Sequence, residues 1–251
     1  MSSTWNETNW KSRFFAIWGG QAFSLFGSHL VQFALVWWLT QKTGSATVLA
    51  TASLVAFLPQ VVLGPLVGTF VDRSKRRWIM IGADSMIALA TLGLIYLFAI
   101  EAVEVWMIYV LLFVRSLGGG FHHPAMTAST SLMVPKDQLT RVQGLNQMLM
   151  GAMAIISAPR GALLLEVTTT QNVLMIEVIT ALIAVTPLLF ITIPEPKRTN
   201  GKATAGVPKP SFWEDFRAGF AYVWAWPGLV MILLLAMLVN FLLNPAGALM
   251  P

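Results

Sequence analysis

Four charged residues stand inside long apolar stretches of this chain: Asp84, Arg115, Arg160 and Glu177. At bilayer depth an arginine costs at least ~2.5 kcal/mol on insertion scales, so Arg115 should face protein or water and find a partner. Asp84 is a candidate partner, either for Arg115 or for the basic loop that precedes it. Intramembrane charges of this kind predict ion pairs or proton-binding sites.

Arg160 and Glu177 flank a turn that is predicted near Thr168 or Thr169. They lie about eight and nine residues from it, which places both ~12–13 Å from the turn at 1.5 Å per residue. Equal depth predicts an ion pair that opens and closes, or a Glu177 that alone binds protons or a cationic substrate. The alternative for Arg160 is a side chain that reaches the outer headgroups.

A polar stripe runs along the first apolar stretch. Its members are Gln21, Ser24, Ser28 and Gln32, spaced by three, four and four residues. At 100° per residue they fall within about 80° of one another on a helix. Because lipid offers no hydrogen-bond partners, the stripe should face a cavity, with helix–helix hydrogen bonding as the alternative.

Gln147 and Gly151 share one face of a later apolar stretch, which Pro159 then interrupts. This pattern predicts close packing with a kink, and it makes both residues further candidates for lining a cavity.

His122 and His123 point about 100° apart on a helix and have no carboxylate at ligand spacing, so no metal site is predicted. Neither a nucleophile–base pair nor a phosphate-binding loop is evident, so we expect no catalytic residue and no cofactor.

These residues must be positioned by membrane-spanning helices. Of the 251 residues, 56% are hydrophobic and 11% are charged, whereas soluble domains carry roughly 25% charged residues. Several apolar runs approach the ~20 residues that a helix needs to cross a bilayer. The predicted spans cover residues 14–39, 46–71, 78–100, 104–123, 139–165 and 172–193, and a seventh run begins near 227. The expected fold class is an all-α membrane protein.

Basic residues in the loops predict the orientation of these spans. Thirteen fall on the side of the N-terminus, whereas Lys42 alone falls on the other. The thirteen are Lys11, Arg13, Arg73, Lys75, Arg76, Arg77, Lys136, Arg141, Lys197, Arg198, Lys202, Lys209 and Arg217. The N-terminus is therefore expected in the cytoplasm. Because the basic residues cluster between apolar runs, nucleic acid is not an expected partner.

A proline-rich segment divides the chain. Residues 194–210 alternate prolines with charges and read as an exposed cytoplasmic linker between a six-helix bundle, 1–193, and a remainder, 211–251. Ser211 and Glu214 form a capping-box pattern that opens a short amphipathic helix. Its phenylalanines at helical spacing predict a helix that lies on the inner membrane face, with membrane lipid as its partner.

The loop after the second span reads Gly68-Thr-Phe-Val-Asp72-Arg73-Ser-Lys75-Arg76-Arg77. It resembles the signature loop that joins the second and third helices of the major facilitator superfamily. Lys75 stands where that loop usually has glycine. The chain is also similar to the macrolide-efflux type of drug exporter in this superfamily. The residues that carry this likeness include Lys42-Thr-Gly-Ser-Ala46, Phe57-Leu-Pro59, Ile79-Met-Ile-Gly-Ala-Asp84, Arg115-Ser, Phe121-His122 and Val134-Pro135.

The resemblance implies export of an amphiphilic drug by alternating access, driven by protons, in the cytoplasmic membrane of a bacterium. It implies that Gly68, Asp72, Arg73, Arg76 and Arg77 form a gating latch; the alternative is that the basic loop only fixes topology. It also implicates Arg115, an arginine followed by glycines, in proton handling.

Such exporters have about twelve spans, whereas the seventh run of this chain reaches Pro251. The resemblance therefore implies a partner, either a second six-helix half or a second copy of the chain. Two other functions stay open: transport of another solute, such as a siderophore or a metabolite, and a half that is inactive without its partner.

Overall fold

The computed structural model describes residues 9–195 and 212–248. The chain divides into two compact units, Met1–Arg198 and Thr199–Pro251, and each is described by itself. All regular elements in the described residues are helical, which agrees with the predicted all-α class.

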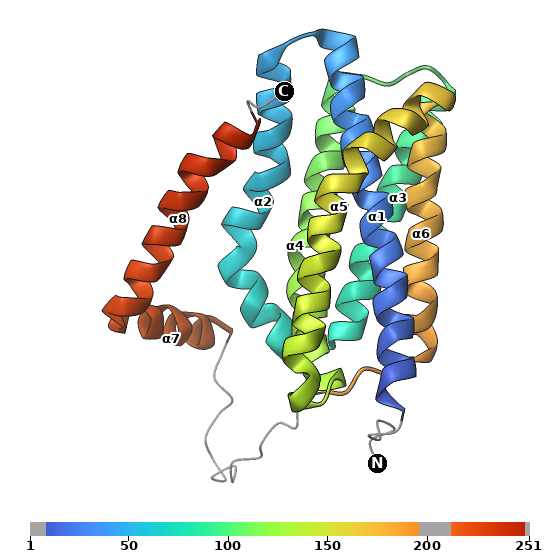
Figure 1. The fold of residues 1–251 in the computed structure, drawn as a ribbon. Coiled ribbons are helices and arrows are strands. Elements are labelled where there is room, and N and C mark those ends of the chain that lie inside the picture. Colours follow the sequence, from blue (N-terminus) through green and yellow to red (C-terminus); the bar gives the residue numbers. More distant parts are fainter. Residues whose placement is uncertain (1–8, 196–211, 249–251) are drawn as a thin grey trace. The chain divides into compact units, whose positions relative to one another are not determined.

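The first unit contains six long helices that run alternately up and down (Figure 1). The bounds are α1 Trp10–Thr43, α2 Ala46–Arg73, α3 Arg76–Ala99, α4 Val105–Met133, α5 Leu139–Val167 and α6 Thr170–Phe190, with a short 3₁₀ turn, η1, at Lys136–Gln138. The α2–α3 and α4–α5 connections lie at the same end of the unit as the start of α1 and the end of α6. We call this end, which carries the basic loop 73–77, the basic end.

All six predicted spans correspond to helices that are long and apolar enough to cross a membrane. The largest difference concerns α4, which continues to Met133 although the predicted span stops at residue 123. Pro124 lies inside this helix. Spanning helices tolerate proline because neighbouring groups re-satisfy the freed backbone carbonyl.

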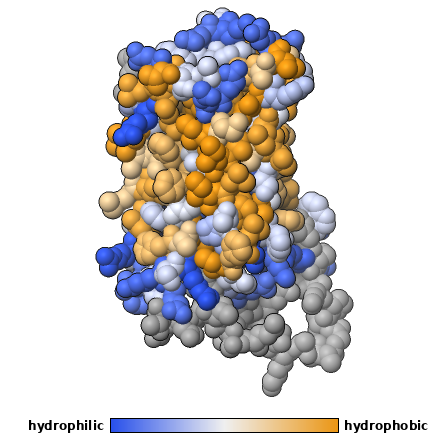
Figure 2. Space-filling model, turned by 90° about the vertical axis from the view of Figure 1, so that its right-hand side faces the viewer, coloured by the Kyte–Doolittle hydropathy of each residue, from blue (hydrophilic) through white to orange (hydrophobic). Residues whose placement is uncertain are grey.

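An apolar band separates two hydrophilic ends on the face shown in Figure 2. Large apolar side chains are exposed along several helices, among them Phe57 and Val61 on α2 and Ile155 on α5. Apolar exposure on this scale is unusual for a soluble monomer and matches contact with lipid or with another helical unit.

The buried core is layered along the helices. One apolar cluster includes Phe14, Met80 and Leu188 near the basic end, and another includes Leu30 and Leu174 toward the opposite end. Buried polar groups occupy the layer between them: Gln21, Ser24, Asp84, Thr91, Ser116, Glu177 and Thr180. Polar groups in the middle of an apolar bundle must bond one another or line a cavity.

Helix α1 occupies the centre of the unit and packs most extensively against α6. Gly27 permits the close approach, because a Cβ atom at that position would collide with the Thr180 hydroxyl and lie 3.2 Å from the Glu177 Cα. Small residues play this role at helix interfaces in membranes.

The second unit contains α7, Phe212–Ala225, and α8, Pro227–Ala248. Helix α8 begins where the seventh apolar run was predicted, and residues 216–225 and 227–239 are bent by 94° at the break. Trp213, Phe220 and Trp224 of α7 are exposed. The interfacial position that the sequence suggests for α7 stays a prediction. Ser211 and residues 196–210 of the predicted linker lie outside the described residues.

Candidate functional site

A polar cavity of about 360 Å³ lies among α1, α2, α3 and α4. All four residues of the α1 stripe, Gln21, Ser24, Ser28 and Gln32, line it. The other polar or titratable residues on its wall are His29, Gln60, Asp84, Arg115, Ser116, His122 and His123. The stripe therefore faces a cavity, and α4 supplies most of the titratable groups opposite it.

Glu177 of α6 is the centre of one polar cluster. Its side chain is 1% exposed, and its Oε1 atom forms an ion pair with Arg115 of α4. The same oxygen accepts a hydrogen bond from Ser28 Oγ at 2.9 Å, and Oε2 accepts one from Thr91 Oγ1 at 2.8 Å. Arg115 Nη2 also donates to the Ser28 carbonyl at 2.8 Å. We call these four residues the glutamate cluster; they join α1, α3, α4 and α6.

The ion pair predicted between Glu177 and Arg160 is not present, because Glu177 pairs with Arg115. Arg160 is exposed on α5 and is not part of the cluster. Counting residues from the turn predicts that both residues lie at the same depth. It does not predict which neighbouring helix each side chain faces. Helix α6 packs far more extensively against α1 and α3 than against α5, so its buried carboxylate faces away from α5.

Asp84 of α3 is the centre of a second polar cluster. Its carboxylate is 6% exposed, and Oδ2 accepts a hydrogen bond from Gln21 Nε2 at 3.3 Å. The Nε2 atom of His122 lies 3.6 Å from the same oxygen, beyond hydrogen-bond distance. We call Gln21, Asp84 and His122 the aspartate cluster. The expectation that Asp84 meets Arg115 or the basic loop is wrong, since its neighbours are an amide and an imidazole.

Two buried atoms of the aspartate cluster have no hydrogen-bond partner among the described residues: Gln21 Oε1 and His122 Nε2. An unsatisfied buried polar atom forfeits about 1–3 kcal/mol, so the cluster has unused bonding capacity. The glutamate cluster differs in that both carboxylate oxygens are occupied.

A second cavity of about 300 Å³ adjoins α1, α4 and α5. It shares Gln21, Leu25, His122 and His123 with the first cavity, so these residues form the wall between the two. Gln147 lines this second cavity, whereas Gly151 is exposed and lines neither. Trp18 Nε1 donates a 2.7 Å hydrogen bond to Asn146 Oδ1 and ties α1 to α5 beside it.

The residues of the predicted latch lie at the basic end. Asp72, 75% exposed, is 3.6 Å from Arg76, and Arg76 also donates to the Ala128 carbonyl at the end of α4. Arg77 donates to the Leu189 carbonyl at the end of α6 at 2.6 Å. Gly68 is exposed near the end of α2, and Arg73 is the last residue of that helix.

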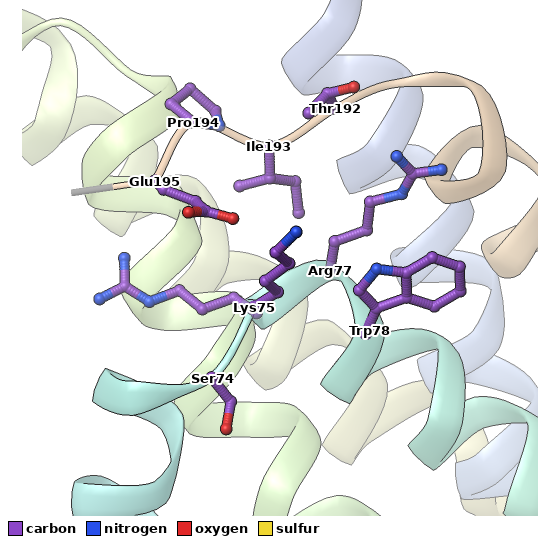
Figure 3. Close-up of a pocket in the computed structure, with 9 residues that line it drawn as sticks. Ser74, Lys75, Arg77, Trp78, Thr192, Ile193, Pro194 and Glu195 are labelled. Atoms are coloured by element: carbon purple, nitrogen blue, oxygen red, sulfur yellow. The ribbon is translucent and has the colours of Figure 1, made fainter. Parts of the chain in front are cut away.

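Lys75 and Glu195 point into a small pocket of about 110 Å³ that lies beside Arg77 and Trp78 (Figure 3). The basic loop thus holds the ends of α4 and α6 together and borders the segment that leaves α6.

Sequence reasoning missed Thr91, Gln60 and Asn146 as parts of these sites. Thr91 carries a usable signal, because it follows Asp84 by seven residues, two helical turns, and therefore shares its face of α3. Gln60 is an isolated polar residue in an apolar stretch, whereas Asn146 lies next to Gln147. Only the packing of α2 and α5 shows what these two residues face.

Comparisons with known proteins place these features in context. A model of the Major Facilitator Superfamily matches residues 17–251. Over 243 residues the chain is 40% identical to "Macrolide efflux protein A" of Streptococcus pyogenes, covering 97% of this chain and 59% of that protein. The protein of the same name from Enterococcus faecalis is 38% identical over 208 residues, 83% of this chain and 62% of its own length. An uncharacterised MFS-type transporter of Bacillus subtilis is 24% identical over 204 residues, 80% of this chain and 47% of its own. The chain thus spans less than two thirds of the length of these relatives.

Proposed function

This chain belongs to the major facilitator superfamily, and we propose that it supplies one wall of a bacterial exporter that expels amphiphilic drugs of macrolide type. The observation that carries the proposal is the open polar cavity of about 360 Å³ among four apolar spanning helices. The similarity to macrolide efflux proteins over 97% of the chain supports the choice of substrate class.

The cavity suits an amphiphile because its wall combines the polar stripe of α1 with apolar side chains such as Leu25, Ile87 and Leu112. Binding sites for drug-sized molecules generally combine apolar lining with a few polar groups that fix orientation. A wall from one bundle leaves the other side of the site to a partner. The partner is a second six-helix unit or a second copy of this chain, and residues 199–251 begin that second half.

Alternating access between these two halves moves the substrate outward, and proton entry drives it. The glutamate cluster ties four helices of the first half together, so this half rocks as one body.

The latch at the basic end opens and closes with the rocking. Asp72 is exposed and lies 3.6 Å from Arg76, a distance too long for a hydrogen bond, which leaves it able to exchange partners. Asp72→Asn should therefore reduce transport at unchanged abundance.

The experiment is drug accumulation in a pump-deficient bacterium. The chain is expressed alone and joined to the second half of a macrolide efflux relative, and uptake of a labelled macrolide is measured before and after the proton gradient is collapsed. Gradient-dependent lowering by the joined form alone supports the proposal with a separate second half. Lowering by the chain alone supports a pair of identical chains. Unchanged accumulation in both cases, with both proteins verified in the membrane, contradicts macrolide export and favours another solute.

Orientation is testable independently because the sequence contains no cysteine. A single cysteine at Lys75 should resist an impermeant thiol reagent in intact cells, whereas one at Glu101 should react. The reverse pattern would contradict a cytoplasmic N-terminus.

A further inference from the structure

The aspartate cluster gathers hydrogen-bond acceptors around a carboxylate, and no permanently charged group among the described residues neutralises that carboxylate. Asp84 supplies a carboxylate, Gln21 an amide oxygen and His122 a ring nitrogen. In the described part of the chain neither the amide oxygen nor the ring nitrogen has a hydrogen-bond partner. Gln21 Nε2 donates to Asp84, but an amide bears no charge, and an imidazole carries one only when it is protonated. A buried carboxylate in apolar surroundings needs a proton or a cation to compensate its charge.

Within the described residues, no permanently charged cation of the protein pairs with Asp84; His122 would supply a charge only when protonated. Among the described residues that line the cavity, Arg115 is the one with a fixed positive charge, and it is engaged with Glu177 and the Ser28 carbonyl. The other titratable groups on the wall are His29 from α1 and His123, which follows His122 on α4. A cationic ligand at Asp84 would therefore not have to displace a permanently charged side chain of the cavity wall.

The site lies where the two cavities meet. Gln21 and His122 belong to the wall that the cavities share, with Asp84 on the side of the first cavity. Apolar side chains extend in both directions, Leu25, Ile87 and Leu112 in the first cavity and Met126 and Met150 in the second. A ligand with one charged group and a large apolar body would place its charge at the wall and its body in the cavities.

We propose that Asp84, Gln21 and His122 form the recognition site for a protonated amino group on an amphiphilic substrate. The ammonium N–H donates to the Asp84 carboxylate, and Gln21 Oε1 and His122 Nε2 supply further acceptors around it. Charge-assisted hydrogen bonds of this kind are the stronger ones in proteins. This proposal rests on the proposed export function and assigns the chemical group of the substrate that the cavity selects.

The test compares two fluorescent probes on the purified full chain in lipid nanodiscs. One is a macrolide with a tertiary amine, and the other is the same macrolide in which an acyl group replaces one N-methyl group, so that the nitrogen belongs to an uncharged amide. The intact chain should bind the amine about tenfold more tightly, a difference of ~1.4 kcal/mol. Asp84→Asn should remove this preference and leave the affinity for the acylated probe unchanged.

Glu166→Gln is the matched control, because it removes a carboxylate that is exposed near the far end of α5. It should keep the tenfold preference. Gln21→Met, which removes the amide acceptor together with the Nε2 donor to Asp84 and keeps the Asp84 charge, should reduce the preference partially. A fall in the affinity of Asp84→Asn for the acylated probe would show a folding defect, and Gln21→Met then decides the question.

Two results would overturn the proposal. In one, the intact chain binds both probes equally well, so that charge is not recognised. In the other, it prefers the amine, but both Asp84→Asn and Gln21→Met keep the full preference. Binding of neither probe would instead contradict the export function on which the proposal rests.

Discussion

Two buried carboxylates in the middle of one helical bundle have opposite surroundings. Glu177 has donors on both oxygens, contributed by Arg115, Ser28 and Thr91 from three other helices. Within residues 9–195 and 212–248, Asp84 accepts one side-chain hydrogen bond, and two buried polar atoms beside it have no hydrogen-bond partner. A carboxylate whose bonds are complete holds helices together, whereas one whose surroundings are incomplete is available to a ligand. Similar burial therefore does not imply a similar role.

Breaking the Arg115–Glu177 pair should have the largest effect on stability. Arg115→Leu or Glu177→Leu alone leaves an unpaired buried charge and should lower the free energy of unfolding by about 3–5 kcal/mol. The double variant Arg115→Leu/Glu177→Leu removes both charges and should recover most of that loss. Thermal unfolding in detergent measures all three. Single variants that unfold at the temperature of the intact chain would show that the pair does not hold the bundle.

Filling the gap between α1 and α6 should come next. Gly27→Ala places a methyl group against Thr180 and should destabilise the fold by about 2 kcal/mol, as overpacking does. Gly19→Ala is the control on the same helix, because its Cβ would have no atom within 4 Å. The same unfolding assay should separate the two variants, and matching melting temperatures would argue against close α1–α6 packing.

Removing one donor from Glu177 should have a smaller effect. Thr91→Val deletes the hydroxyl bonded to Oε2 and should lower stability by about 1 kcal/mol, the scale of hydrogen bonds between spanning helices. Thr51→Val removes an exposed hydroxyl that bonds its own helix at the Thr47 carbonyl, and it should leave the melting temperature nearly unchanged. If Thr51→Val destabilised as much as Thr91→Val, the hydroxyl on Glu177 would have no special role.

Asp84→Asn should have the smallest effect on stability. The asparagine oxygen still accepts from Gln21, and the removed charge has no fixed cationic partner, so we expect a change within about 0.5 kcal/mol or a slight stabilisation. A loss comparable to that of Glu177→Leu would erase the difference between the clusters and assign Asp84 a structural role.

The sequence predicts the helices of this protein well because each span can be recognised from its own residues alone. The six spans and the α1 stripe follow from apolar length and from a 3.6-residue period, which are local properties. The resemblance at Gly68–Arg77 and the later comparisons agree on the family.

Partner choice inside the bundle could not be predicted in the same way. The depth of a residue along its helix follows from counting residues. Which neighbouring helix its side chain faces depends on how the helices pack, and counting does not give that. Glu177 was therefore assigned to Arg160 at equal depth, whereas α6 turns it toward Arg115. Asp84 and His122 lie on different helices, and no sequence spacing links them.

The most direct test of the difference between the clusters is export per folded molecule. Asp84→Asn and Glu177→Gln are compared in the chain joined to a macrolide-efflux second half, with labelled macrolide accumulation divided by the amount of folded protein in the membrane. We expect Asp84→Asn to show normal abundance with most export lost, and Glu177→Gln to show low abundance with export per molecule retained. Normal export by Asp84→Asn, together with abundant but inactive Glu177→Gln, would contradict this assignment.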